Sequence, residues 1–286
     1  MNTVRSVCIK CPARVNLFLN VNGINETKKL HSITAVNQTI DMYDYITITE
    51  LPLKRNTEKN INILSNNLTS ETSYEDFYCA CNIFFAYTNI TPNNLHISIF
   101  NDINVLGLGN KASNIAGILL GLNTYYKTGL ANHELRYLAS LINFEAPYFI
   151  TGGYAKITGC GENIKSLDSD NPYKFYLILI PNMNISTGEM FASITKDNLR
   201  KKIFQPGIIH NDFNDFMPDE LKRLRNFLLK YPNIEHSLSG VGPAYFVASK
   251  SLITNELKRT LKYEFPNFDG YIRRNCHGHK IITKIL

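Results

Sequence analysis

Apolar and polar residues alternate at the start of the chain, over residues 4–21, with apolar positions at Val15, Leu17, Leu19 and Val21. A period of two is typical of a β-strand with one buried face. Residues 22–29 are polar and predict a loop. Similar patterns predict further strands over 33–48, 60–64, 95–100, 148–157, 174–180 and 280–285, and a glycine turn leading into a strand over 237–248.

A second pattern repeats every three to four residues and predicts helices. It is clearest over 113–126, where Ile115, Ile118, Leu119 and Leu122 form one apolar stripe. Further helices are expected over 74–88, 133–142, 220–230 and 252–263. Because strands and helices mix without strict alternation, the chain predicts a layered α+β fold. A polar break at 168–172 predicts two domains, residues 1–168 and 169–286.

Composition narrows the class of protein. Of 286 residues, 44% are hydrophobic and 19% are charged, which indicates a globular chain rather than a disordered one. The net charge is +6, but the basic residues are scattered and not interleaved with aromatic ones, so no nucleic-acid partner is expected. The mild positive field would attract a small anionic ligand. No apolar run approaches the roughly 18 residues of a membrane span, and the N-terminus is polar, so we expect a cytoplasmic protein without a membrane partner.

Six cysteines raise the question of a metal site or a disulfide. Cys8 and Cys11 form a C-x-x-C pair, but Cys79 and Cys81 do not have the spacing of a second zinc-ligand pair. Cys8 and Cys11 also fall on a predicted strand, where positions three apart face opposite sides. Reduced thiols are therefore expected.

Three glycine motifs are the main candidate chemistry. The first, residues 107–114, lies between a predicted strand and a predicted helix, and a helix N-terminus can bind an anion. A tight strand-to-helix connection without a ligand is the alternative. The phosphate-loop pattern G-x-x-x-x-G-K-[ST] is absent. The other two motifs are Gly152-Gly153 with Gly159 and Gly161, and Ser239-Gly240-Val241-Gly242-Pro243.

These segments, in their order, resemble a known family. Cys11-Pro12-Ala13-Arg14-Val15-Asn16-Leu17-Phe18-Leu19 resembles the N-terminal signature of the GHMP kinases. Further matches to the family follow at 30–31, 41–44, 107–114, 145–149, 153–162, 181–191, 211–212 and 239–243. The resemblance spans residues 10–247. Within the family it is to the kinases that act on a cytidine-diphosphate sugar alcohol in the non-mevalonate isoprenoid pathway.

The resemblance implies two α+β domains, the N-terminal one binding ATP, with the active site in the cleft between them. It also implies transfer of the γ-phosphoryl group of ATP, with Mg²⁺, to a hydroxyl of this small-molecule substrate. The implied catalytic residues are Arg14 and Glu145. The implied ATP-binding residues are Gly107, Leu108, Gly109, Asn110, Lys111, Ala112 and Ser113, with Ser113 also a metal ligand. The implied substrate-binding residues are Asn16, His31 and Phe191. We expect a monomer or a homodimer.

The chain departs from the family at the residues that carry the chemistry. Arg14 replaces a lysine and Glu145 replaces an aspartate, so each side chain is longer with its charge kept. We expect a direct bidentate ion pair between them, which could occupy the place of the acceptor hydroxyl. The alternative is that the two residues changed together and still support the reaction.

Two further departures affect the ligands. Asn110 and Lys111 replace glycines, and Lys111 would be strained if its φ had to be positive, although it could also supply a cation to the phosphates. Leu30 replaces an aromatic residue, so binding of the base should be weaker, or the ligand different. His31 could also be a loop histidine without a ligand. The alternative function is therefore a kinase-fold protein that binds a nucleotide or a partner without phosphoryl transfer.

Overall fold

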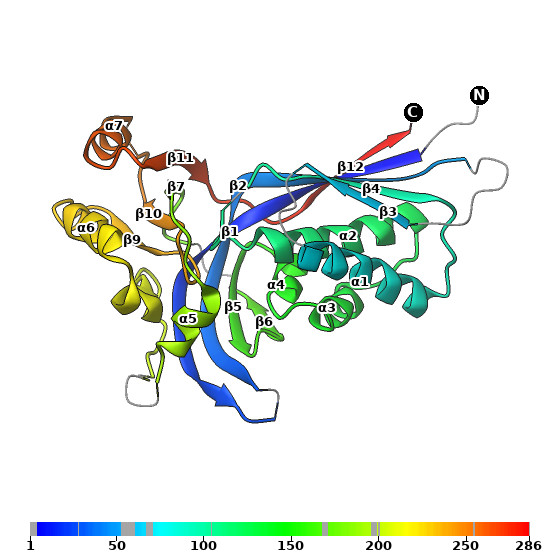
Figure 1. Cartoon of the computed structure of the whole chain (residues 1–286), viewed down its shortest axis with the longest axis horizontal. Helices are drawn as coiled ribbons and strands as arrows, with labels where there is room; N and C mark the ends of the chain where they lie inside the picture. The colour runs from blue at the N-terminus through cyan, green and yellow to red at the C-terminus, as the bar shows by residue number, and fades with distance from the viewer. Residues whose placement is uncertain are drawn as a thin grey trace.

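The computed structural model describes residues 5–27, 29–52, 61–66, 71–103, 105–167, 171–195, 199, 201–253 and 255–285. Its strands form two sheets that lie beside each other (Figure 1). The larger sheet holds β1 (Arg5–Asn25), β2 (Leu30–Glu50), β3 (Ile61–Ser65), β4 (Leu95–Phe100), β5 (Tyr154–Gly159), β6 (Asn163–Ser166), β8 (His210–Asn211) and β12 (Lys280–Ile285). The smaller sheet holds β7 (Phe175–Pro181), β9 (Glu235–Leu238), β10 (Tyr245–Ser249) and β11 (Phe268–Arg274).

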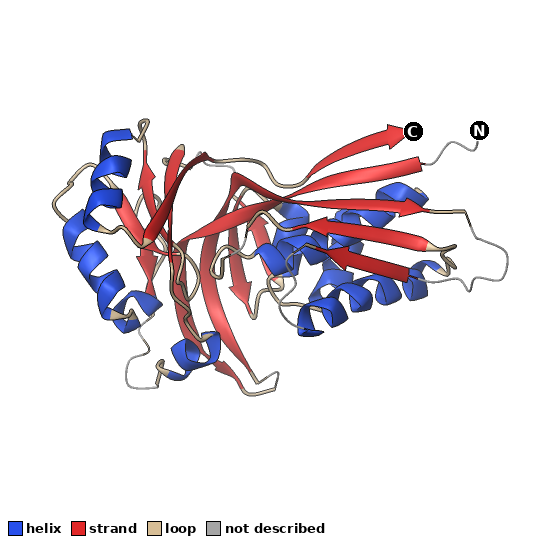
Figure 2. Ribbon diagram, turned by 45° about the horizontal axis from the view of Figure 1, so that its top comes forward, coloured by secondary structure: helices blue, strands red, loops and turns tan. Residues whose placement is uncertain are grey.

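Helices cover one face of each sheet (Figure 2). Those beside the larger sheet are α1 (Glu71–Thr88), α2 (Asn110–Tyr126), α3 (Asn132–Ser140) and α4 (Ala146–Thr151). Those beside the smaller sheet are α6 (Asp219–Leu228) and α7 (Asn255–Glu264). The short helix α5 (Thr187–Ala192) lies between β7 and β8 in the sequence. The 3₁₀ helix η1 (Asp212–Phe216) directly follows β8.

Helix α2 lies directly against the larger sheet because it carries glycine where the strands come closest. A Cβ added to Gly117 would lie 2.3 Å from Cys11 Sγ, and one added to Gly121 would lie 2.6 Å from Ile9 Cδ1. The rest of this helix face is fully buried and includes Ile115, Ile118 and Leu119. The burial of this apolar stripe fixes the helix, and with it the loop that precedes it.

The long hairpin of β1 and β2 bends where the candidate site lies. Its antiparallel register shifts between Pro12 and Ala13 and again between Asn16 and Phe18. Such bulges re-aim side chains and increase the local twist. Arg14 and Asn16 lie in the short stretch between the two shifts.

The layered α+β class with two sheets is confirmed. The strand predicted over 148–157 is wrong in its first half, because residues 146–151 form α4. Pro147 stands in the first turn of that helix, and Gly152, with φ 65°, ends it. Tyr148, Phe149 and Ile150 are all buried, and the periodicity of a fully buried run cannot separate a helix from a strand.

Other element boundaries shift by a few residues. Helix α2 begins at Asn110 rather than at residue 113, and β1 extends to Asn25, into the predicted loop at 22–29. Strand β11 was not predicted. The expected domain boundary at 168/169 lies outside the described residues. Beyond it, β11 belongs to the smaller sheet, whereas β12 pairs with β1 at the edge of the larger sheet.

The six cysteines are free thiols. Within the described ranges, no three His, Cys, Asp or Glu residues are grouped as a metal site would require. None of the described helices is long and apolar enough to cross a membrane.

Candidate active site

A cavity of about 460 Å³ lies where the β1–β2 hairpin, the start of α2 and the loop after β9 meet. Its lining combines polar and apolar side chains. They include Arg14, Asn16, Leu30, His31, Asn37, Gly107, Gly109, Asn110, Lys111, Ala112, Glu145, Phe191 and Gly240. The cavity therefore contains most of the residues that the sequence indicated, although they come from six separate segments of the chain.

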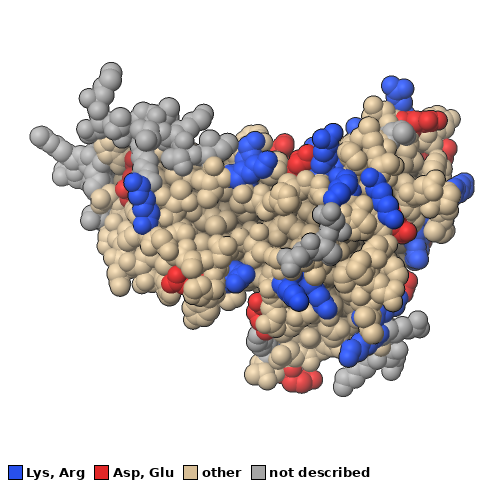
Figure 3. All heavy atoms as spheres, turned by 180° about the vertical axis from the view of Figure 1, so that it is seen from behind, with Lys and Arg blue, Asp and Glu red and all other residues tan. Residues whose placement is uncertain are grey.

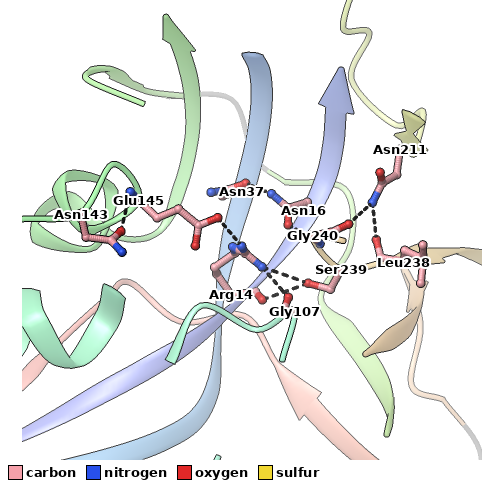
Figure 4. A network of polar contacts seen from close by, with 10 residues as sticks. All are labelled: Arg14, Asn16, Asn37, Gly107, Asn143, Glu145, Asn211, Leu238, Ser239 and Gly240. Carbon is pink, nitrogen blue, oxygen red and sulfur yellow. Dashed lines mark hydrogen bonds and ion pairs between the residues drawn. The ribbon is translucent and has the colours of Figure 1, made fainter. Parts of the chain in front are cut away.

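Arg14 lies at the centre of the polar network (Figure 4). Its Nη2 is 2.8 Å from Glu145 Oε1, which confirms the ion pair. Its Nη1 donates to Gly107 O and, at 3.3 Å, to Ser239 Oγ. The pair is not bidentate, so that part of the prediction is wrong. The guanidinium divides its donors among the carboxylate, the first glycine motif and the third, since a planar fork can serve several acceptors at once.

Arg14 and Glu145 differ in exposure. The Arg14 side chain is 3% exposed and that of Glu145 is 37% exposed. The Asn143 side chain accepts from the Glu145 backbone N–H at 2.8 Å and fixes the turn that leads into α4. No described residue hydrogen-bonds to Glu145 Oε2. Glu145 therefore uses one oxygen in the ion pair and presents the other to the cavity.

Two asparagines extend the network from the hairpin to the third glycine motif. Asn16 Nδ2 donates to Asn37 Oδ1 at 2.7 Å, and Asn16 Oδ1 accepts from Gly240 N at 2.7 Å. From the other side, Asn211 Nδ2 donates to the carbonyl oxygens of Leu238 and Gly240. These bonds bind the smaller sheet's loop to the larger sheet at the rim of the cavity (Figure 4). Asn16 thus lines the cavity with one amide N–H bonded to Asn37 and its amide oxygen bonded to Gly240, and its second amide N–H can serve a ligand.

The first glycine motif forms an open helix N-terminus. Gly107 and Gly109 have φ values of 92° and 75°, and Gly109 is the N-cap of α2. A Cβ on Gly107 would lie 2.5 Å from Ser239 O, so only glycine permits this approach of the two loops. The N-cap makes no side-chain hydrogen bond, and the first turn carries no acidic residue. The backbone N–H groups of this turn and the helix dipole favour an anion here.

The condition for strain at the replaced glycines, a positive φ, is not met. Asn110 and Lys111 are the first two residues of α2, and neither is among the residues with positive φ. Asn110 Nδ2 donates to Ile103 O at 3.0 Å. Lys111 forms an ion pair with Asp76 of α1 at the edge of the cavity. Its role as a phosphate-binding cation stays a prediction, in which a phosphate would compete with Asp76.

Leu108 and Ser113 are placed differently from the rest of the loop. Leu108 is fully buried in the apolar core, and only its carbonyl, which accepts from Arg14 N, contacts the site. Ser113 is fully buried as well, with its hydroxyl 3.5 Å from His279 Nε2. Neither is among the residues that line the cavity. The prediction of Ser113 as a metal ligand stays untested, and its position gives it no support.

The two aromatic residues that were predicted to bind substrate lie together. The His31 and Phe191 rings are 4.6 Å apart between centroids and inclined by 34°. Phe191 is also packed edge-on against Phe213, with centroids 4.9 Å apart. Leu30, beside them, is 42% exposed. His31 therefore packs against Phe191 at the edge of the cavity, and its role in substrate binding stays a prediction.

Two ionisable groups outside the cavity hold the segments that form it: Asp44, which is fully buried, and His279, which is half-buried. Asp44 accepts from Asp102 N, Ile103 N and Asn114 Nδ2, and so joins the segment before the glycine motif to α2. Burial raises the pKa of Asp44 to about 6 in spite of these hydrogen bonds. Burial lowers the pKa of His279 to about 4, so that its ring is neutral at pH 7.

Sequence analysis did not single out Asn37, Asn143 or His279. Asn37 could have been found, since it lies opposite Asn16 in an antiparallel register and two positions along from Ala35, on the same strand face. Asn143 precedes Glu145 by two residues, a spacing at which an asparagine often bonds to the following backbone. No local pattern connects His279 to the site, because its contacts are more than 100 residues away in the chain.

Known kinases are similar to this chain over most of its length. No family model matches the chain. The 4-diphosphocytidyl-2-C-methyl-D-erythritol kinase of Persephonella marina is 32% identical over 289 residues, covering 97% of this chain and 98% of that protein. The enzyme of the same name from Clostridium tetani is 30% identical over 262 residues, covering 83% and 89%.

Solved structures show the same fold. A 4-(cytidine 5'-diphospho)-2C-methyl-D-erythritol kinase superposes with a TM-score of 0.74 at 18% identity, covering 94% of this chain and 99% of the other. A homoserine kinase from Cytophaga hutchinsonii gives 0.72 at 15% identity, with 97% of both chains covered. These identities are low and establish the GHMP kinase fold alone. Together with the curated relatives, they show that the chain belongs to the 4-diphosphocytidyl-2-C-methyl-D-erythritol kinase family.

Proposed function

We propose that the chain is an ATP-dependent kinase that phosphorylates a hydroxyl of 4-(cytidine 5'-diphospho)-2-C-methyl-D-erythritol, or of a related small alcohol, in isoprenoid precursor synthesis. The observation that carries the proposal is the position of Glu145. Its Oε2 is unengaged in the same cavity as the open N-terminus of α2. A carboxylate beside an anion site is what transfer of a phosphoryl group to a hydroxyl requires.

The residues divide the reaction between them. The first-turn N–H groups of α2 bind phosphate oxygens, and Gly107 and Gly109 let the backbone approach them. Glu145 accepts the proton of the acceptor hydroxyl through Oε2. Arg14 holds Glu145 in place and adds positive charge where negative charge builds up during transfer. The Arg14–Glu145 pair therefore positions the base and leaves one of its oxygens for the acceptor.

The residues that line the cavity leave Mg²⁺ to be held largely by the ATP substrate. Mg²⁺ is usually held by one or two carboxylates together with substrate phosphates and water. Among the described residues that line the cavity, Glu145 is the single carboxylate. Mg²⁺ would therefore be held mainly by phosphate oxygens and water, and Glu145 would stay available as the base. When bound, the ion supplies neutralisation of phosphate charge.

The opposite end of the cavity would hold the cytosine base, with Phe191 and His31 as its ring contacts. Asn16 lies between this end and Arg14, and it would orient the linking atoms of the substrate. The non-catalytic alternative is not favoured, because the relatives that cover nearly all of the chain are named as kinases.

A small anionic substrate also suits the surface. On the face shown in Figure 3, Lys and Arg side chains are scattered among uncharged atoms and Asp and Glu. A nucleic-acid partner usually requires a basic stripe instead. We propose that the enzyme acts in the cytoplasm, without a nucleic-acid or membrane partner, as a monomer or a homodimer.

The test is turnover of the cytidine-diphosphate alcohol with ATP and Mg²⁺ by the wild-type chain and by Glu145→Gln. General-base catalysis contributes about 10²–10⁴-fold, so we expect kcat to fall by that factor while calorimetry shows unchanged binding of a non-hydrolysable ATP analogue. Glu256→Gln, on α7 and outside the cavity, is the matched control. Retained activity of Glu145→Gln would refute the role of the base, and failure of the wild type to bind ATP would refute the kinase.

A further inference from the structure

A short segment near the C-terminus crosses from one sheet to the other. Residues 275–279, here called the crossing segment, connect β11 of the smaller sheet to β12 of the larger one (Figure 1). Cys276 N donates to Thr39 O at 2.9 Å, and Thr39 Oγ1 donates to Cys276 O at 2.7 Å. Hydrogen bonds to β2 thus hold its first half, and the pairing of β12 with β1 holds its other end.

His279, at the end of the crossing segment, lies between the two helices that begin at the active site. Its Nε2 is 2.9 Å from Ser113 O in the first turn of α2, and its Nδ1 is 3.0 Å from Phe149 O in α4. The neutral ring carries one N–H, so it donates to one of these carbonyls at a time. His279 does not line the cavity and contacts neither Arg14 nor Glu145.

The neighbouring glycine brings the segment against the end of α4. A Cβ on Gly152 would lie 2.6 Å from Gly278 Cα, and the two glycines have φ values of 65° and 112°. Two backbones approach this closely only without side chains. The crossing segment is therefore seated on α4 by backbone contact as well as by the His279 ring.

Ser113 and Phe149, whose carbonyl oxygens lie beside the His279 ring, also contact the first glycine motif. Ser113 N donates to Gly109 O at 2.9 Å, and the Phe149 ring lies 2.8 Å from where a Cβ on Gly109 would be. Helix α4 begins directly after Glu145. A change in the spacing of α2 and α4 would thus move the phosphate-binding turn relative to the carboxylate.

We propose that His279 is a positioning residue for phosphoryl transfer, which fixes the spacing between the phosphate-binding turn of α2 and Glu145 at the start of α4. The proposal rests on the kinase function proposed above. Displacement of reacting groups by 1 Å can cost about 100-fold in rate. Substrate binding depends less on this spacing, because each helix keeps its own part of the cavity.

The experiment compares His279→Leu, His279→Gln and His279→Asn with the wild type, all shown to be folded by circular dichroism at the assay temperature. Leucine fills the site without a donor, so we expect kcat to fall about 10–100-fold with KM for both substrates changed by less than about threefold. Gln places its amide nitrogen near the position of Nε2, and Asn places it near Nδ1. At least one should recover most of kcat, and which one does identifies the carbonyl that matters. His277→Leu, an exposed residue of the same segment, should match the wild type.

A second readout does not depend on turnover. Hydrogen exchange of the Ser113 and Gly152 amides should accelerate at least about tenfold in His279→Leu, while that of α1 stays unchanged. Unchanged kcat and exchange in His279→Leu would overturn the proposal, as would a loss of kcat that neither Gln nor Asn recovers. If the wild type has no kinase activity, the proposed function fails while the exchange measurement still decides whether His279 fixes the two helices.

Discussion

The two ends of the cavity differ in how the residues that depart from the family resemblance contact their neighbours. At the end where we propose that phosphate binds, called the phosphate end, Arg14 and Glu145 are longer than the lysine and aspartate that the resemblance implies. They meet at 2.8 Å, and Arg14 makes further bonds to two glycine loops. At the end proposed for the cytosine base, called the base end, Leu30 has no aromatic ring, and the His31 and Phe191 rings contact each other. The longer side chains at the phosphate end therefore form one hydrogen-bonded network, whereas Leu30 places no aromatic ring at the base end.

The largest effect is expected from a substitution that breaks the Arg14–Glu145 ion pair at the phosphate end. Glu145→Asp shortens the side chain by one methylene. Its carboxylate then no longer reaches Arg14 or the acceptor hydroxyl, so kcat should fall about 100-fold. Arg14→Lys in addition should recover about tenfold, because the two residues act as one unit with a coupling of about 0.5–3 kcal/mol. Steady-state kcat of the two single variants, the double variant and the wild type gives the coupling. Effects that simply multiply would show that the pair is not a unit.

The next prediction concerns Asp44, which holds the segment before the first glycine motif, and the pH dependence of the free energy of unfolding. The pKa of Asp44 is about 6 in the folded chain and about 4 when exposed, so the folded state binds this proton more tightly. The stability contribution is complete below pH 4 and is lost as pH rises through 6, amounting to at most about 3 kcal/mol. Chemical unfolding between pH 4 and 7 should show this fall in wild type but not in Asp44→Asn. A variant with the same pH dependence as the wild type would assign it to another group.

Phe191→Ala probes the base end and should act on KM. Stacking on a base is worth about 1–3 kcal/mol, so KM for the cytidine substrate should rise about 5–150-fold while kcat and KM for ATP stay within threefold. Tyr263→Ala, 84% exposed and outside the cavity, is the control. A fall in kcat with unchanged KM would place Phe191 at the phosphate end instead.

Sequence was sufficient for elements with a clear period or a fixed motif. The α2 stripe, β4 and the meeting of Arg14 with Glu145 were all predicted, because each depends on local pattern or on ordered motifs. It was insufficient for α4, whose run of Tyr148, Phe149 and Ile150 is buried on every side. It also missed the division of the Arg14 donors, which depends on where Gly107 and Ser239 lie in space. Contacts that the fold brings together over long sequence separations leave no local signal.

The smallest effect is expected from a substitution that adds an aromatic ring at the base end. Leu30 lines the cavity beside His31 and is 42% exposed, so a larger ring has room there. Leu30→Tyr should lower KM for the cytidine substrate about fivefold, since one added stacking contact is worth about 1 kcal/mol at the lower end of the range. Leu229→Tyr, 65% exposed at the end of α6, introduces the same ring away from the cavity and should change nothing. An equal KM in Leu30→Tyr and the wild type would mean that the base does not reach Leu30, and that the difference between the two ends arises from His31 and Phe191 alone.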